Sequence, residues 1–397
     1  MTNEEYAARA AWQEKRRATE RKNREAAKGA LDLPFLLLTL LLTGIGLVML
    51  FSASFPSAYY ETGDATYYVK RQAIYAAVGV IGMLVVGKFN YQRLRGAAQI
   101  LLGGALFLLI LVVIPGVGIT KNNATRWLGI DGVLTFQPSE IAKLAVIVYF
   151  ADSISKKKER MRDLREGVLP YGVWLAVIAV LMLLEPHLSG TILIVGTGAI
   201  MMAVGGMPAW LIGAGVGGVA AAAWGFVALV DAGIISYGAS RINMWHNPWL
   251  DSSDQGYQMV QSLIAIGSGG LFGKGWMNGT QVRYGFVPEH DTDFIFSTVG
   301  EGWGILGTML VLFLLCALIL RLMKMGQRQE EPFGRIYSYC VAAMILYHVL
   351  VNVGMTIGLM PVMGIPLPFI SYGGSSLLGF TIMLFIAIRL DASPTRI

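Results

Sequence analysis

LPFLLLTLLLTGIGLVMLFSASF, the run at residues 33 to 55, contains 23 consecutive residues without a charged side chain. A helix rises about 1.5 Å per residue, so a run of this length can cross the roughly 30 Å hydrocarbon core of a bilayer. The charged residues 1 to 32 precede it and form a segment longer than the n-region of a signal peptide. We therefore expect the run to be an uncleaved membrane helix.

Similar apolar runs recur along almost the whole chain, which is 55% hydrophobic and only 14% charged. Soluble domains contain roughly 25% charged residues, so the composition indicates an integral membrane protein. We predict an all-α, polytopic fold with about ten transmembrane helices. The expected spans are 33–55, 72–86, 97–114, 139–151, 169–184, 189–204, 209–230, 294–323, 336–359 and 367–390.

The distribution of Lys and Arg predicts which side of the membrane each loop faces. With a cytoplasmic N-terminus, 23 of the 31 Lys and Arg residues fall in cytoplasmic segments and 7 in outer segments. This bias satisfies the positive-inside rule, and an even number of helices then places the C-terminus in the cytoplasm as well. The net charge of +6 is explained by this anchoring, and we expect no nucleic-acid partner.

The predicted topology divides the chain into a cytoplasmic charged tail at 1–32, a membrane domain at 33–391 and a short cytoplasmic tail at 392–397. A large extracytoplasmic loop at 231–293 joins helices seven and eight. Loops of this length are usually functional. Its apolar residues suggest that it lies on the membrane surface or folds back over the helices, as one wall of a lipid cavity or as a docked lid.

Polar residues of the predicted helices and adjoining loops gather on the extracytoplasmic side. Ionisable groups at membrane level commonly mark functional sites, so we expect an outward-facing site there. The residues that converge are Arg71, Arg126, Glu140, Lys143, Glu185, His187, Asp293, Ser371, Tyr372, Ser375 and Ser376.

Several of these residues also have a purely structural explanation. Asp293 could cap the eighth helix, and Glu185 and His187 could cap helix ends beside Pro186. Glu140 and Lys143 are spaced i, i+3 and could form a structural ion pair. The D-x-D spacing of Asp291 and Asp293 could hold a divalent cation, although two carboxylates in a loop are a weak metal signal.

Six motifs follow one another along the membrane domain. They are YYVKRQ at 67–72, ATRWLGI at 124–130, FQPSEIAKLA at 136–145, GYQMVQSLIAIGSGGLFGKG at 256–275, VPEHDTDFIF at 287–296 and GLMPVMGIPLPFISYGGSSLL at 358–378. In this order they resemble the shape, elongation, division and sporulation (SEDS) family, typified by FtsW, RodA and SpoVE. Some motifs look like the FtsW and SpoVE branch and GKGWMNGTQ looks more like RodA, so the branch stays open.

The resemblance implies a peptidoglycan glycosyltransferase that polymerises lipid II into polyprenyl-linked glycan at the outer face of the bacterial plasma membrane. It also implies a class B penicillin-binding protein as transpeptidase partner. The family's essential Asp maps onto Asp293. The chain departs from the family pattern at Asp291, where a His is usual, and at Gly302, where an acid is usual.

The residues themselves fit glycosyl transfer. A sugar hydroxyl is a poor nucleophile, and Asp293 could accept its proton as it attacks an anomeric carbon. The polyprenyl pyrophosphate leaving group needs cations, for which Arg71, Arg126 and Lys143 are candidates, and a divalent ion could share this task. A single displacement would invert the donor's configuration. Further candidate substrate-binding residues are Glu140, Gln261, Ser371 and Ser375.

Two other functions stay open from sequence. A flippase for the lipid-linked precursor would use Glu140, Lys143 and Glu185 in a path across the bilayer, but the cytoplasmic halves of the helices have few ionisable residues. A non-catalytic scaffold would only recruit a transpeptidase. The sequence does not distinguish roles in cell division, elongation and sporulation.

Overall fold

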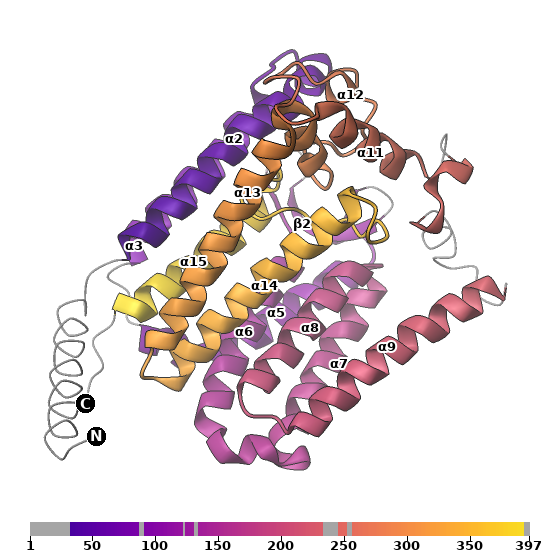
Figure 1. Cartoon of the computed structure of the whole chain (residues 1–397). Coiled ribbons are helices and arrows are strands. Elements are labelled where there is room, and N and C mark those ends of the chain that lie inside the picture. The colour runs from indigo at the N-terminus through magenta and orange to yellow at the C-terminus, as the bar shows by residue number, and fades with distance from the viewer. Residues whose placement is uncertain are drawn as a thin grey trace, which may run out of the picture.

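The computed structural model describes residues 32–86, 91–121, 124–130, 134–232, 245–251 and 256–392. Within them, ten helices of 16 residues or more run roughly along one direction and overlap the ten predicted spans (Figure 1). They are α2 (Leu33–Thr62), α3 (Tyr67–Val86), α5 (Ala98–Val113), α6 (Pro138–Lys157), α7 (Leu169–Leu184), α8 (Leu188–Val204), α9 (Ala209–Asp231), α13 (Ile295–Arg328), α14 (Pro332–Thr356) and α15 (Gly374–Ala392). The predicted all-α membrane fold is confirmed.

The membrane-spanning character follows from helix length and hydropathy. Among the described residues, five helical segments are long and apolar enough to cross a bilayer, namely α2, α13, α14, α15 and the segment 164–184 that contains α7. Shorter apolar helices include α5 and α8. The chain is therefore a multi-pass membrane protein. The predicted tails fall mostly at residues 1–31 and 393–397, which lie outside the described residues.

One end of the bundle, called here the Asp32 end, carries an ion cluster. The Asp32 carboxylate accepts a hydrogen bond from the Phe35 amide at 3.1 Å and so caps α2. It also pairs with Arg321 at 2.8 Å and with Arg328 at 3.8 Å, both from α13. Charges of this kind lie at a membrane boundary rather than in hydrocarbon. The opposite end, which contains Asp293, is called the Asp293 end.

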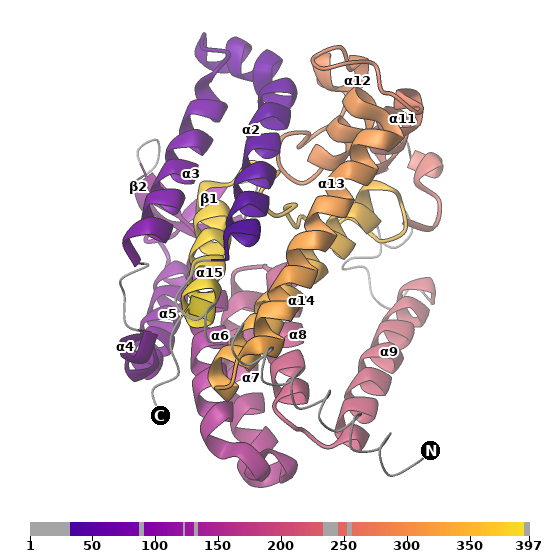
Figure 2. The same ribbon diagram turned by 60° about the vertical axis from the view of Figure 1, so that its left-hand side comes forward.

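The core is formed by the central helices α6, α13, α14 and α15. Phe150, Leu315, Tyr337 and Met383, one from each helix, are fully buried. In contrast, α9 stands at the edge of the bundle in both views (Figures 1 and 2), and its Trp224 is 77% exposed. Large apolar side chains on such an outer surface suit contact with lipid.

A small antiparallel sheet joins α5 to α6 where we expected only a loop. Its strands are β1 (Ile119–Lys121), β2 (Ala124–Ile130) and β3 (Leu134–Phe136), in the order β1-β2-β3. The strands are short, so their alternation was too brief to predict from sequence. The helix that follows is also longer than predicted, since α6 has 20 residues. The sheet holds Arg126 beside the helix bundle.

The eighth predicted span, too long for a simple crossing, is a helix with a break. Gly304 in α13 has φ 68° and ψ −163°, a conformation that favours glycine. Segment 270–275 fills the break, because two of its amides bond to the carbonyls of Glu301 and Gly302 at 2.9 and 3.0 Å. One of its carbonyls accepts from the amide of Ile305 at 2.9 Å. A membrane helix tolerates a break only where the freed backbone groups are paired in this way.

The large loop folds back over the bundle, which was one of the two arrangements that we expected from its apolar residues. Its described part contains η3 (Pro248–Asp251), α11 (Tyr257–Gly269) and α12 (Thr280–Arg283). Gly269 lies so close to α13 that a Cβ there would be 2.0 Å from the carbonyl oxygen of Gly300. Residues 233–244 and 252–255 of the predicted loop lie outside the described residues. The loop and the first part of α13 therefore pack as one unit.

Candidate active site

A cavity of about 510 Å³ opens among α3, α6, α8, α14 and the segments 289–293 and 364–376, at the Asp293 end. Polar residues far apart in the sequence meet there. Six of the eight predicted site residues line it, namely Arg71, Arg126, Glu140, Lys143, Asp293 and Ser375. The other two do not line it: Gln261 lies on α11, and Ser371 lies behind the wall. The roles of all eight stay predictions.

Asp293 lies two residues before the start of α13 at Ile295 and is half-buried. The residue at the N-cap position is Phe294, without a side-chain capping bond, so the structure does not support the explanation of Asp293 as a helix cap. The pKa of Asp293 is raised to about 7, first by burial and then by the nearby charges of Glu289 and Asp291, while Arg126 opposes the shift. A carboxyl group with such a pKa can exchange a proton near neutral pH.

The backbone around Asp293 is held by two side chains from elsewhere in the chain. The Asn352 side-chain amide donates to the carbonyls of Asp293 at 2.8 Å and Ile365 at 2.7 Å. The Ser371 hydroxyl donates to the carbonyl of Thr292 at 2.6 Å. Ser371 is therefore a structural contact rather than a lining residue. Asn352 was not predicted, although an asparagine inside the apolar run of the ninth span was a signal for it.

Two arginines lie at the cavity wall. Arg126, on β2, donates to the carbonyl of Glu185 at 3.3 Å and to that of Pro186, across the connection between α7 and α8. Arg71, on α3, donates to the Tyr67 hydroxyl at 2.7 Å, with its guanidinium 5.5 Å from the centre of that ring. These contacts fix the two guanidinium groups at the cavity wall. Both can attract a phosphate group.

Deeper in the cavity, Lys143 and Glu140 form the ion pair that their spacing predicted. The Lys143 ammonium lies 2.6 Å from Oε1 of Glu140, and both side chains are about nine-tenths buried. Within the described residues, Oε2 of Glu140 and the Ser139 hydroxyl have no hydrogen-bond partner. A buried acceptor without a partner is costly, so these atoms suit a substrate hydroxyl or a water molecule.

His348 also lines the cavity and was not predicted. It lies on α14 one turn before Asn352, and its Nδ1 is 2.8 Å from the Met344 carbonyl. That contact requires a proton on Nδ1, so Nε2 of the neutral ring is an acceptor. The edge of Phe380 packs against the ring at 4.9 Å between centroids. His348 therefore adds a fixed acceptor to the cavity.

In the part of the chain that the structure describes, no three His, Cys, Asp or Glu side chains come close enough to hold an ion. Glu185 is 2% exposed, and burial raises the pKa of this residue to about 8 against the opposing charge of Arg126. Asp291 differs from the family pattern, and burial raises its pKa as well.

The chain was compared with known proteins. The family model for FtsW, RodA and SpoVE, described as a cell cycle protein, matches residues 33–395. A probable peptidoglycan glycosyltransferase FtsW from Geobacter sulfurreducens is 39% identical, over 91% of this chain and 96% of that protein. Stage V sporulation protein E of Bacillus subtilis is 37% identical over the same shares.

One solved structure agrees closely in fold. It comes from work on the structural coordination of polymerization and crosslinking by a peptidoglycan synthase complex, with a TM-score of 0.74 and 28% identity over 91% of this chain and 98% of that one. The family match covers most of the chain, and the relatives align over nearly their whole length. The chain therefore belongs to the FtsW, RodA and SpoVE family of cell cycle proteins.

Proposed function

We propose that the chain is a peptidoglycan glycosyltransferase that polymerises lipid II, with Asp293 as its general base. The observation that carries the proposal is a half-buried carboxyl group with a pKa of about 7, in a cavity that also contains Arg71, Arg126 and Lys143. The activity named for the relatives agrees with this chemistry. A base and several cations are the two requirements of glycosyl transfer from a pyrophosphate donor.

In the proposed step, a sugar hydroxyl of one substrate attacks the anomeric carbon of the other. Asp293 accepts the hydroxyl proton as the new carbon–oxygen bond forms. The bond from the anomeric carbon to the polyprenyl pyrophosphate breaks, and its electrons leave with the phosphate. Arg71, Arg126 and Lys143 stabilise that charge, and a divalent cation could assist them. One displacement converts an α-linked donor into a β-linked product.

The proposed topology puts both termini in the cytoplasm and the Asp293 end outside the bacterial plasma membrane. The Lys and Arg bias supports this orientation. The membrane domain then covers residues 33–391, with cytoplasmic tails on either side. A lipid II head group on the outer leaflet would reach the cavity directly.

The proposed partner is a class B penicillin-binding protein, whose transpeptidase domain would crosslink the new strand. A similar chain was solved in work on a peptidoglycan synthase complex that couples polymerization with crosslinking. Family membership and this similarity support the same kind of complex here. The assay therefore includes the co-expressed partner.

The direct test uses purified protein with lipid II in detergent. An enzyme forms glycan polymer under these conditions, whereas a flippase needs a sealed vesicle to have any measurable effect. A scaffold would give no polymer on its own and would tolerate Asp293→Asn in cells. Polymer from the wild type and its loss in Asp293→Asn would support the proposal. Absence of polymer from the wild type, with and without the partner, would contradict it.

The rate of polymerisation is expected to rise with pH. Only the ionised carboxylate accepts a proton, and with a pKa of about 7 the ionised fraction of Asp293 grows from about one tenth at pH 6 to about nine tenths at pH 8. We expect kcat/KM to rise about eight- to tenfold over this interval and then level off. The measurement is a pH series of initial rates with lipid II.

The assignment of the pH profile to Asp293 needs a control at Glu185, because the pKa of Glu185, about 8, falls in the same pH interval. Glu185→Gln keeps the neutral shape of the buried side chain, so the variant should retain the pH profile if Asp293 is the titrating group. A profile that becomes flat in Glu185→Gln, or that is flat in the wild type, would contradict the assignment.

Asn352→Leu is expected to lower kcat about 10- to 100-fold with little change in KM, because misplacing a reacting group by about an ångström costs this much. The substitution removes both bonds that hold the backbone at Asp293 and Ile365. Thr356→Val is the matched control, since its hydroxyl bonds only to Val353 on the same helix, at 2.9 Å. If Asn352→Leu polymerised lipid II as fast as Thr356→Val, the asparagine would not be required.

A further inference from the structure

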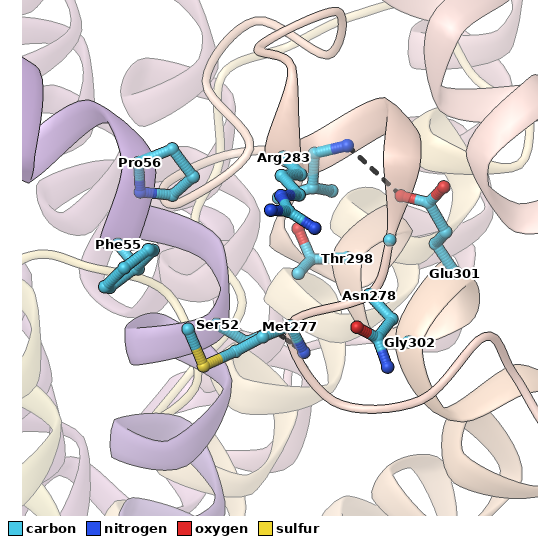
Figure 3. Close-up of a pocket in the computed structure, with 11 residues that line it drawn as sticks. Ser52, Phe55, Pro56, Met277, Asn278, Arg283, Thr298, Glu301 and Gly302 are labelled. Atoms are coloured by element: carbon cyan, nitrogen blue, oxygen red, sulfur yellow. Dashed lines mark hydrogen bonds between the residues drawn. The ribbon is translucent and has the colours of Figure 1, made fainter.

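A second hollow, of about 220 Å³, lies between α2, segment 277–283 and the first part of α13 (Figure 3). Its wall includes Ser52 and Phe55 from α2, Arg283 from α12, and Thr298 and Glu301 from α13. Among the described residues, none lines both this hollow and the larger cavity. The hollow is therefore a separate place on the molecule with its own chemistry.

The hollow lies at the level of lipid head groups. Ser52 is 19 residues beyond Leu33, where α2 begins beside the ion cluster of the Asp32 end. At about 1.5 Å per residue this is roughly 28 Å along the helix, close to the roughly 30 Å thickness of the hydrocarbon core. Phe55 and Trp276, next to the hollow, are 37% and 47% exposed. Exposed aromatic side chains are typical of the membrane–water interface.

Arg283 supplies a positive charge that no carboxylate of the described residues neutralises. Its side chain is exposed and lines the hollow, and Figure 3 draws it above Thr298. Within the described part of the chain its guanidinium has no hydrogen-bond or ion-pair partner. An arginine that faces a hollow at the membrane surface is a suitable donor for a phosphate group, which it can bind with two parallel hydrogen bonds.

Glu301, the nearest carboxylate in the wall, is already occupied. It is fully buried, and its Oε1 accepts from the Lys274 ammonium at 2.7 Å and from the Gln281 amide at 2.9 Å. Its Oε2 accepts from the Val282 amide at 3.1 Å (Figure 3). The Lys274 charge balances that of Glu301, so the hollow keeps the net positive charge of Arg283.

Neighbouring residues of one short segment, 292–298, line the larger cavity and the hollow. Asp293 and Thr292 line the cavity, whereas Thr298, five residues after Asp293, lines the hollow. The Thr298 hydroxyl donates to the carbonyl of His290 at 2.9 Å and so ties the two sides together. A group bound in the hollow would therefore lie beside the segment that carries the proposed base.

We propose that this hollow binds the phosphate of a membrane lipid through Arg283. The phosphate could belong to an anionic phospholipid or to the pyrophosphate of a polyprenyl carrier, and the chemistry of recognition is shared. The second source rests on the proposed function, since polymerisation brings together two polyprenyl-linked substrates while Arg71, Arg126 and Lys143 in the cavity serve one leaving group. The hollow would then hold the pyrophosphate of the second substrate.

The test measures binding in an Asp293→Asn background, so that no turnover occurs. For the carrier, farnesyl pyrophosphate is titrated into the purified protein by calorimetry, and we expect two sites. Arg283→Gln should weaken one of them about tenfold, as loss of a charge-assisted contact does. For the phospholipid, retention of phosphatidylglycerol against phosphatidylcholine is measured by native mass spectrometry after purification from mixed nanodiscs. Arg283→Gln should then abolish the preference for phosphatidylglycerol.

Lys70→Gln is the matched control, because Lys70 is an exposed cation at the Asp293 end, paired with Asp64 at 2.8 Å. It should leave both measurements unchanged. Arg283→Glu serves as a second variant with a larger effect, and Arg283→Lys should restore part of the binding. An effect of Arg283 on pyrophosphate alone, on phosphatidylglycerol alone or on both supports the site and identifies its source.

No effect of Arg283→Gln and Arg283→Glu on either probe would overturn the proposal. These binding results are independent of whether the wild type polymerises lipid II. A failure of the proposed function would therefore leave the phosphate site standing, and a failure of the site would leave the role of Asp293 standing.

Discussion

Asp293→Asn is expected to lower the rate of lipid II polymerisation by about 100-fold or more, since a positioned general base typically contributes 10²- to 10⁴-fold. Asparagine has nearly the same shape, so the backbone bonds from Asn352 should persist. It cannot accept a proton at neutral pH. The measurement is the initial rate of glycan formation by purified protein, with the melting temperature as a check on folding.

Asp291→Asn is the matched control for this result. Asp291 is a second carboxylate two positions away, and its carbonyl accepts from the Tyr372 amide at 2.8 Å. Because that contact uses the backbone, the substitution should keep the loop in place and change the rate less than about tenfold. The base assignment would be wrong if Asp293→Asn retained the wild-type rate, or if Asp291→Asn lost as much activity as Asp293→Asn.

Glu301→Gln is expected to destabilise the protein by roughly 1–3 kcal/mol, the usual cost of leaving a buried donor without its acceptor, because the Lys274 ammonium that loses its counter-charge is partly exposed. The carboxylate is fully buried and accepts from Lys274, Gln281 and Val282. Glutamine keeps one acceptor but leaves the Lys274 ammonium without its counter-charge. The measurement is the unfolding transition in detergent, together with the rate of proteolysis in residues 270–283.

A double-mutant cycle makes this prediction specific. Lys274→Met alone should also destabilise the protein, because the buried Glu301 carboxylate is left without its charged partner. Lys274→Met combined with Glu301→Gln should cost clearly less than the sum of the two single changes. Additive effects would show that the two groups do not stabilise each other, and a neutral Glu301→Gln would show that the carboxylate is dispensable.

The sequence alone predicted the helices and the convergence of polar residues at one end. Helix length is fixed by the thickness of the hydrocarbon, so each apolar run near 20 residues, such as 33–55, corresponds to one helix of the structure. The Lys and Arg bias then oriented the helices relative to one another. From that orientation we expected Arg71, Glu140 and Asp293 at one level of the membrane, although the first and last are more than 200 positions apart. In the structure all three line one cavity.

Features that depend on distant partners could not be predicted in this way. Asn352 acts on a carbonyl 59 positions away, and nothing in the local sequence identifies that contact. The break at Gly304 is stable only because segment 270–275 supplies the missing hydrogen bonds. The same limit applies to Gln261 and Ser371, which do not line the cavity, because a sequence predicts the level of a loop residue in the membrane but not the direction of its side chain.

The reciprocal hydrogen bonds at the break in α13 have a consequence for chimeric proteins. The first part of that helix is completed by amides and carbonyls encoded some thirty positions earlier, in segment 270–275. Swapping segment 270–275 for that of a relative without the helix, or the helix without the segment, would leave main-chain groups of a membrane helix unpaired. Segment 270–275 and the first part of α13 should therefore be transplanted together between family members.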